Sequence, residues 1–324
     1  RSVVTWNALI TGYSKYMHDE EAIHFYDHMQ LEGIFPDCIT FSCILKSCRD
    51  LRNLDKGCEL HAEISRKSYL HKDIVLSSTL LENFYVGSAL VDMYAKCGSL
   101  MDAKVVFDKL LSRNVVSWNA IIRACIRYDL CDEGYSCFKQ MCHEGVSPSG
   151  DTFICSLKAC GCIGAVEKGR ELHLAVDRLG LLQKDVQLCY ALLEMYVKCG
   201  LLTKAYEVFE ELPVRNVVAW TSLISGYAQH EYGEEAVKFY ENMQREGFPP
   251  DEITCVCILK ACGSVGADNK GKQIHAKIVN EDWLERNVLV GTALIDMYSK
   301  CGALQNAYEV FNQLQLWNIV TWNA

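Results

Sequence analysis

The sequence predicts an all-α solenoid of antiparallel helix-turn-helix repeats, and two observations carry this prediction. The first is a block that is written three times as MYAKCG, MYVKCG and MYSKCG, at 93–98, 195–200 and 297–302. The second is the opening VVTWNALI at 3–10, which returns in altered form at 115–122, 217–224 and 319–324. The long period divides into sub-blocks of about 35, 36 and 31 residues, which is typical of stacked repeats rather than of one catalytic domain.

A single unit, residues 3–37, shows two helices and a short loop. Apolar side chains recur at helical spacing in both halves, as Trp6, Ile10 and Tyr13 and then as Ala22, Tyr26 and Met29. Asp19 is expected to cap the second helix, which Gly33 and Pro36 should end. Small residues open several second helices, where they let the neighbouring helix approach: Ala22, Ala205, Ala236 and Ala307. No segment predicts a half-buried strand.

Composition restricts the class of protein. Half of the 324 residues are hydrophobic and only five are proline, so the chain can form a continuous core with little disorder. No apolar run approaches the length of a membrane span, and no signal or transit peptide is evident. The chain opens on Arg1-Ser2 and stops inside a fresh repeat at Ala324, so we expect an excised segment of a longer protein. The net charge of −9, from 41 acidic and 32 basic residues, argues by itself against nucleic acid. A solenoid can nevertheless carry its acidic residues on the convex face.

The cysteine and histidine positions in the sequence give little support for a metal site or for catalysis. The 18 cysteines include recurrent sets, Cys97, Cys199 and Cys301 and then Cys48, Cys160 and Cys262. Such positions are too far apart to share a metal, so we interpret them as small apolar core residues in a reducing compartment. His18-Asp19-Glu20 fits the His-x-Glu of nucleotide deaminases but lacks the accompanying Pro-Cys-x-x-Cys. His61, His173 and His275 recur and are interpreted as packing residues. We therefore expect no cofactor, no metal and no enzymatic activity in this segment.

A helical hairpin of about 35 residues has two candidate families. The fifth position carries Asn7, Asn119, Thr221 and Asn323, and the unit closes with Gly-x-x-Pro-Asp at 33–37 and again at 247–251. The glycine expected at the eighth position of a tetratricopeptide repeat is instead Ile10, Ile122 and Ile224. With these features the chain resembles the pentatricopeptide repeat family, and its alternating unit lengths resemble the plant PLS class. The resemblance covers essentially the whole chain and implies a right-handed superhelical solenoid.

On this pattern the P units are 3–37, 115–149 and 217–251, the L units 38–73, 150–185 and 252–287, and the S units 84–114, 186–216 and 288–318. A partial P unit occupies 319–324. An insert at 74–83 looks like a second copy of the S-unit opening, and either copy can serve as the first helix. The insert is as compatible with a gene-model artefact as with a functional segment.

The resemblance implies that the fifth and last residues of a unit meet the edge of one unstacked RNA base. The predicted pairs are Asn7/Asp37 for U, Ser88/Asn114 for A, Asn119/Ser149 for C, Thr221/Asp251 for G and Thr292/Asn318 for A. Tyr190/Asn216 departs from the pattern and is assigned no base. The expected reading is 5′-U-x-A-C-x-x-G-x-A-Y-3′. The second residues Val4, Val116 and Val218 are expected to clamp base faces by apolar contact.

The L units carry Ser42, Ile154 and Val256 at the fifth position, and two of these cannot hydrogen-bond a base. The resemblance implies that L units are spacers or docking sites for small organellar editing-factor (MORF-type) proteins. The expected function is binding of single-stranded RNA in a plant mitochondrion or chloroplast, with the mitochondrion slightly favoured, to select a C-to-U editing site. The alternatives are a protein-binding scaffold of tetratricopeptide type and RNA stabilisation or splicing without editing.

Overall fold

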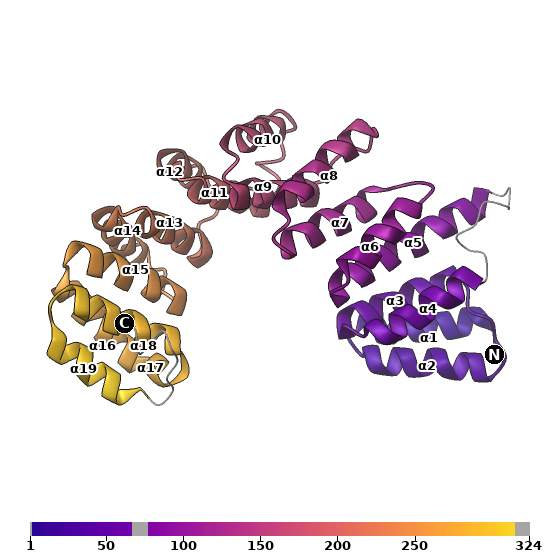
Figure 1. Ribbon diagram of the computed structural model, residues 1–324, viewed down its shortest axis with the longest axis horizontal. Helices are drawn as coiled ribbons and strands as arrows, with labels where there is room; N and C mark the ends of the chain where they lie inside the picture. The colour runs from indigo at the N-terminus through magenta and orange to yellow at the C-terminus, as the bar shows by residue number, and fades with distance from the viewer. Residues whose placement is uncertain (1, 67–76, 315–324) are drawn as a thin grey trace. The chain divides into compact units, whose positions relative to one another are not determined.

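The computed structural model describes residues 2–66 and 77–314, without the side chains of 77–84 and of Glu285. Over these residues the secondary structure is helical, from α1 to α19, and contains no strand (Figure 1). The prediction of an all-α chain of helical hairpins is therefore confirmed. The chain divides into two compact units, Arg1–Ala159 and Cys160–Ala324.

Each hairpin consists of two antiparallel helices joined by a short loop. The predicted P segments form α1 (Val3–Lys15) with α2 (Asp19–Leu31), α7 (Val115–Arg127) with α8 (Cys131–His143), and α13 (Val217–Gln229) with α14 (Gly233–Arg245). The predicted L segments form α3 (Cys38–Leu51) with α4 (Leu54–Arg66), α9 (Gly150–Ile163) with α10 (Val166–Arg178), and α15 (Glu252–Val265) with α16 (Asp268–Asn280).

The predicted S segments form shorter hairpins. These are α5 (Ser77–Cys97) with α6 (Leu100–Lys109), α11 (Val186–Lys198) with α12 (Leu202–Glu210), and α18 (Val288–Lys300) with α19 (Leu304–Gln313). A single additional turn, α17 (Trp283–Arg286), lies between α16 and α18. The helix α5 is 21 residues long because it begins inside the predicted insert and continues without a break into the following S segment.

Neighbouring hairpins stack through their first helices. In the first compact unit α1, α3, α5 and α7 pack in succession, and α2, α4 and α6 each pack on the next first helix. In the second compact unit α11, α13, α15 and α18 pack in the same way. The periodic apolar residues lie between these helices: Ile10, Ala22, Tyr26 and Met29 are fully buried, and Trp6 is nearly so. Within each compact unit the core is therefore continuous between hairpins, as a repeat fold requires.

A recurrent glycine lets the second helix of each L hairpin approach the following S helix. A Cβ atom placed on Gly57 would lie 2.5 Å from Met93 Sδ, and one placed on Gly169 would lie 2.5 Å from Met195 Sδ. A Cβ atom on Gly271 would lie 2.5 Å from both Sδ and Cε of Met297. These methionines belong to the thrice-written MYxKCG block. The repetition of this block in the sequence is thus explained by a packing contact that the fold makes three times.

One local prediction is wrong. The N-cap of α2 is His18, which makes no side-chain capping hydrogen bond, and Asp19 is the first residue of the helix. Asp19 is 6 % exposed and, with Glu20 and Glu21, it places negative charge in the first turn, where it interacts favourably with the helix dipole. The expected end of α2 is confirmed, since Gly33 follows the helix with φ of +73°.

Candidate nucleic-acid interface

The last residue of a predicted unit is the N-cap of the next first helix. The side chain of Asp37 accepts a hydrogen bond from the backbone N–H of Thr40 at 2.9 Å. Asn114 accepts from Ser117 N–H at 2.7 Å, and Asp251 accepts from Thr254 N–H at 2.8 Å. These bonds satisfy backbone donors that a helix start leaves unpaired, so local folding fixes the position of each last side chain.

The fifth and last residues of the first P segment are hydrogen-bonded to each other. Asn7 Nδ2 donates to Asp37 Oδ1 and Oδ2, both at 2.9 Å. The hydroxyl of Thr40 lies 2.5 Å from Asn7 Oδ1 and donates to it. The adjacency that the sequence predicted for Asn7 and Asp37 is therefore present across 30 residues of chain.

This arrangement determines the orientation of the Asn7 amide. Turning the amide over would place its oxygen against the Asp37 carboxylate, where two acceptors would repel each other. Burial tends to raise the pKa of Asp37, but hydrogen bonds from the Thr40 amide and from Asn7 outweigh it and lower that pKa. The carboxylate is thus ionised near neutral pH and acts only as an acceptor.

The second P segment repeats this geometry with a neutral partner. Asn119 Nδ2 donates to Ser149 Oγ at 3.2 Å, and Thr152 Oγ1 donates to Asn119 Oδ1 at 2.7 Å. Ser149 can both donate and accept, whereas Asp37 only accepts. Asn7 and Asn119 therefore make the same type of contacts with the bridging threonine and the last residue. They differ in that the last residue only accepts hydrogen bonds in the first P segment and can also donate them in the second.

The third P segment joins its fifth and last residues through a bridging hydroxyl. Thr221 Oγ1 lies 2.6 Å from Thr254 Oγ1, which donates to Asp251 Oδ1 at 2.6 Å. Thr221 and Asp251 line an open surface pocket of about 270 Å³ together with Val218. The pocket is also bounded by Lys198 and Glu194 of α11 and by Ile253 of α15.

The S segments are less uniform. Ser88 Oγ donates to Asn114 Oδ1 at 3.3 Å, so the copy of the S opening that follows the insert provides the pair. Tyr190 OH donates to the backbone oxygen of Val214 at 3.0 Å, consistent with its departure from the pattern. Thr292 Oγ1 donates to Val288 O at 2.8 Å, and its predicted partner Asn318 lies outside the described residues.

The second residues are exposed, whereas the fifth residues are not. Val4, Val116 and Val218 are 71 %, 55 % and 61 % exposed. Asn7, Ser88, Asn119 and Thr221 are less than 10 % exposed. Each of them is hydrogen-bonded to the last residue, to the bridging hydroxyl or to both. Each P segment therefore presents an exposed apolar side chain beside a nearly buried fifth residue and a half-buried last residue.

Two sets of residues were missed by the sequence reasoning. The bridging residues Thr40, Thr152 and Thr254 are fully buried and contact both members of each P pair. Their repetition three positions after the last residue is a signal that could have identified them. Exposed lysines also recur along the first helices of the L segments, at Lys46, Lys158 and Lys260.

The fifth residues of the L segments offer little for base recognition. Ser42, Ile154 and Val256 are only half-buried. Exposed apolar side chains nevertheless recur at the second position of two L segments, where Ile39 is 55 % and Ile253 is 65 % exposed. The L segments thus present apolar surface without the paired polar groups of the P segments.

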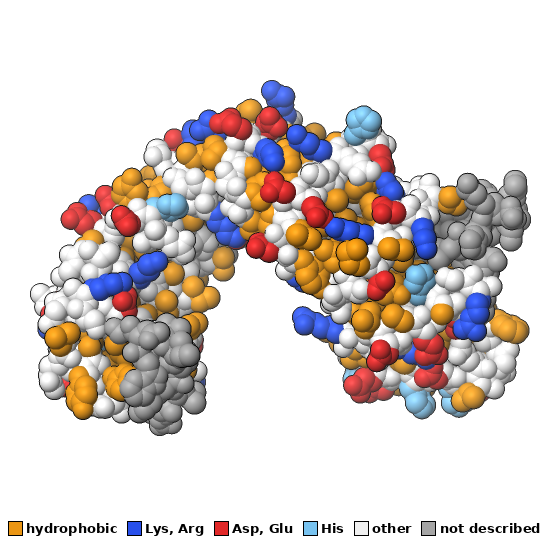
Figure 2. Space-filling view, in the orientation of Figure 1, with side chains coloured by type: hydrophobic (Ala, Val, Ile, Leu, Met, Phe, Trp, Pro, Cys, Tyr) orange, Lys and Arg blue, Asp and Glu red, His pale blue; other side chains and the backbone are white. Residues whose placement is uncertain are grey.

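Acidic residues gather on the second helices. The helix α2 carries Asp19, Glu20, Glu21 and Asp27, whereas Lys15 is the only charged residue of α1 and α13 carries none. The space-filling view shows both signs of charge interspersed with apolar side chains on its visible face (Figure 2). The excess of acidic over basic residues in the chain therefore does not lie on the first helices that carry the polar pairs.

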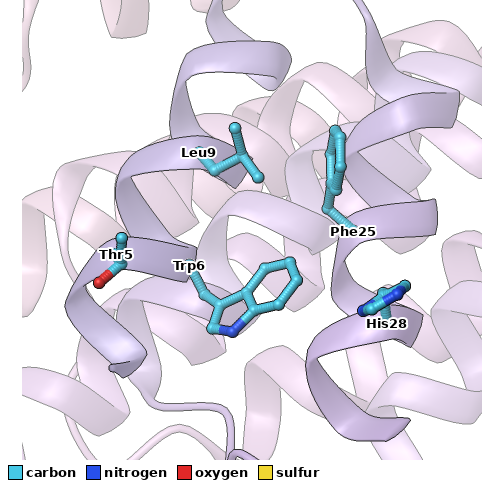
Figure 3. A pocket seen from close by; sticks show the side chains of 5 residues that line it. All are labelled: Thr5, Trp6, Leu9, Phe25 and His28. Carbon is cyan, nitrogen blue, oxygen red and sulfur yellow. The ribbon is translucent and has the colours of Figure 1, made fainter. Parts of the chain in front are cut away.

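A separate pocket lies on α1 and α2 and is lined by Thr5, Trp6, Leu9, Phe25 and His28 (Figure 3). Leu9 is 38 % exposed, whereas the corresponding Ile121 and Leu223, which face a preceding hairpin, are 1 % and 0 % exposed. The pocket therefore lies on the face that corresponds to the one by which later hairpins pack on a preceding hairpin. It contains none of the predicted base-contacting residues.

The recurrent histidines and cysteines pack in the core and its margin. Each histidine Nδ1 is hydrogen-bonded to a tyrosine hydroxyl, in the pairs His61–Tyr94, His173–Tyr196 and His275–Tyr298 at 2.8–3.0 Å. Among the described residues, no group of three or more potential ligands could hold a metal ion. Within the same residues, no helix combines the length and apolarity that a bilayer crossing needs.

The fold and the paired residues define a helical-repeat protein with one polar pair per P hairpin. A family model described as the PPR repeat family matches residues 1–50, 113–162 and 215–264, and one described as the PPR repeat matches 88–115, 189–217 and 292–319. The chain belongs to the pentatricopeptide repeat family.

Curated relatives agree with this membership. The chain is 34% identical over 326 residues to a chloroplastic pentatricopeptide repeat-containing protein of Arabidopsis thaliana, covering 100% of this chain and 50% of the relative. A second chloroplastic relative is 32% identical over 100% of this chain and 36% of its own length. A mitochondrial one is 32% identical over 99% and 56%. The chain spans about half the length of these relatives.

A solved structure shares the fold. The pentatricopeptide repeat protein PPR10, in complex with an 18-nucleotide psaJ RNA element, aligns with a TM-score of 0.66 at 17% identity. The alignment covers 96% of this chain and 50% of PPR10. At this identity the likeness concerns the fold alone.

Proposed function

We propose that this chain binds single-stranded RNA in a plant organelle, one base per repeat, and that it belongs to the PLS class. The observation that carries the proposal is the repeated pairing of fifth and last residues beside an exposed second residue. Asn7 and Asp37, with Val4, form the clearest example. Such a site offers an apolar surface for a base face and polar groups for its edge.

The geometry supports the base assignments as follows. Asp37 and Asp251 are acceptors that fit the imino N–H of a keto base, U at the first P unit and G at the third. Ser149, which can donate, fits C at the second P unit. Ser88 with Asn114 supports A, and Thr292 with Asn318 is proposed for A on the sequence alone. The full proposal is the reading 5′-U-x-A-C-x-x-G-x-A-Y-3′.

We assign the electrostatic attraction between the chain and the RNA phosphates to the first helices of the hairpins. Lys46, Lys158 and Lys260 recur there, and acidic residues concentrate on the second helices. Phosphate contacts by lysine release counterions, so RNA affinity should fall steeply as salt rises. Moderate affinity is expected because the chain as a whole is acidic.

The proposed role is to select a site of C-to-U editing, with the catalytic part supplied elsewhere. The L units, whose second residues Ile39 and Ile253 are exposed, are proposed to dock small editing-factor proteins of the MORF type. The organelle is proposed from the relatives named chloroplastic or mitochondrial.

The test is selection from a randomised single-stranded RNA pool, followed by direct titration with the enriched RNA at several salt concentrations. Enrichment of the proposed reading would support sequence-specific recognition. A flat base profile would contradict it. Absence of RNA binding at low salt would instead favour a protein-binding scaffold.

A further inference from the structure

The hairpin α7–α8 carries two thiols where the other P hairpins carry two aromatic rings. The aromatic pairs are Tyr13–Phe25 in α1–α2 and Tyr227–Phe239 in α13–α14, each with ring centroids 4.8 Å apart. The corresponding residues of α7 and α8 are Cys125 and Cys137. Both members of the pair are therefore exchanged together in this one hairpin.

The two thiols face each other across the hairpin. Cys125 and Cys137 are free, and the interaction between the two thiols lowers the pKa of Cys125 and raises the pKa of Cys137. A Cβ atom placed on Gly134, one turn before Cys137, would lie 3.5 Å from Cys125 Cβ, so α8 passes closely over this thiol. Cys125 is fully buried, whereas Cys137 is partly exposed.

A cation accompanies the thiols. Lys104 of α6 occupies the position of Tyr206 in α12, whose ring lies 5.5 Å from that of Phe239. Lys104 forms an ion pair with Glu133 of α8. The interaction with the Cys137 thiol lowers the pKa of Cys125; burial opposes this effect, and the positive charge of Lys104 assists it. An aromatic trio has thus been replaced by Lys104, Cys125 and Cys137.

The recurrent cysteines provide an internal contrast. Cys97, Cys199 and Cys301 direct their thiols to the backbone oxygens of Cys48, Cys160 and Cys262 at 3.6–3.8 Å. Burial raises the pKa of Cys48, Cys160 and Cys262 to about 12. These thiols stay protonated and should be poor nucleophiles.

We propose that Cys125 and Cys137 form a reversible disulfide within the hairpin by exchange with a low-molecular-weight disulfide. One thiol of the pair attacks, as its thiolate, one sulfur of the external disulfide and releases one thiolate. The other thiol, as its thiolate, then attacks the protein sulfur of the mixed disulfide and releases the second thiolate. The two protein thiols lose two electrons and two protons, and the external disulfide is reduced to two thiols.

The bond has a physical consequence for this hairpin. It joins the two helices across a short loop, which reduces the entropy of the unfolded chain. Oxidation should therefore raise the thermal midpoint of the protein by a few degrees. The helix α7 also carries Asn119, but the inference does not depend on RNA binding.

The experiment exposes the whole chain to oxidised glutathione, then blocks remaining thiols by alkylation and maps the peptides by mass spectrometry. The expected result is a Cys125–Cys137 link that forms while Cys48, Cys160 and Cys262 remain alkylated. Glutathione retained separately on Cys125 or Cys137, or equally fast oxidation of the recurrent cysteines, would overturn the proposal.

Variants separate the roles of the three residues. The double variant Cys125→Tyr with Cys137→Phe restores the aromatic pair of the other hairpins, and its thermal midpoint should not respond to oxidation. Cys125→Ser should trap glutathione on Cys137, because the resolving thiol is gone. Lys104→Met should slow formation of the link by roughly three- to tenfold, and Lys104→Arg should preserve the rate. Failure of Cys125→Ser to accumulate the mixed disulfide would contradict the proposed exchange with an external disulfide.

Discussion

Asn7 and Asp37 lie 30 residues apart in the chain, and the amide of Asn7 donates to both carboxylate oxygens of Asp37 at 2.9 Å. The pair is closed by Thr40, whose hydroxyl donates to Asn7 Oδ1. Its polar groups are therefore satisfied before any ligand arrives. A base edge that binds here must replace or share these bonds, so the gain on binding is a difference between two hydrogen-bonded states.

Thr221→Asn should convert the third P unit into a copy of the first. Asp251 and Thr254 already repeat the frame of Asp37 and Thr40, and only the fifth residue differs. The asparagine should adopt the orientation of Asn7, and the preferred base should shift from G towards U by about 1–3 kcal/mol. Selection from a randomised RNA pool with both proteins measures this shift.

The reciprocal substitution Asn7→Thr is the matched control. It gives the first P unit the threonine of the third, and its base preference should move from U towards G. Preferences at the other positions should stay unchanged in both variants, since each repeat contacts its own nucleotide. Movement at several positions at once would contradict the one-base register.

Thr254→Val should weaken both the fold and the site. The variant removes a fully buried hydroxyl that donates to Asp251 and pairs with Thr221 at 2.6 Å. The Thr221 hydroxyl then loses its partner, and the free energy of unfolding should fall by about 1–3 kcal/mol. Urea denaturation measures the loss, and the same substitution at the exposed Thr203 should change stability by less than about 0.5 kcal/mol. Equal effects at the two positions would show that the bridge is not stabilising.

The fold could be predicted from the sequence because repetition supplies many independent observations of one hairpin. The side-by-side position of Asn7 and Asp37 could be predicted too, since a unit ends where the next first helix begins. The bridging role of Thr40 was missed, because a threonine in a first helical turn is compatible with many environments and only its repetition at Thr152 and Thr254 marks it. The cap of α2 was assigned to Asp19 on propensity, but the turn at Met17, with φ of +63°, places His18 there instead.

Trp118→Ala should be more destabilising than Trp6→Ala. Trp118 is fully buried with its ring 4.7 Å from that of Phe107, and the Arg113 guanidinium lies 4.6 Å from the Phe107 ring. Trp6 instead lines the pocket of Figure 3, with the His28 ring at 5.7 Å. We expect a loss of about 3–5 kcal/mol at Trp118. Urea unfolding of the two variants checks the order, and a reversed order would contradict the account of the stacking face.

Folding stability should decline as the pH falls below the ordinary histidine range. Burial lowers the pKa of His61, His173 and His275 from the ordinary value of 6.5. The folded state therefore favours the neutral ring, whereas the unfolded chain binds a proton as the pH drops below about 6.5. The stabilisation from the neutral ring is present above pH 6.5 and is lost as the pH falls toward the lowered folded-state pKa. Urea unfolding between pH 8 and pH 5 measures this dependence. His275→Gln should reduce its slope, because one of the three groups no longer titrates, whereas His143→Gln at an exposed position serves as the matched control. An unchanged slope in His275→Gln would show that this histidine does not contribute to the pH dependence.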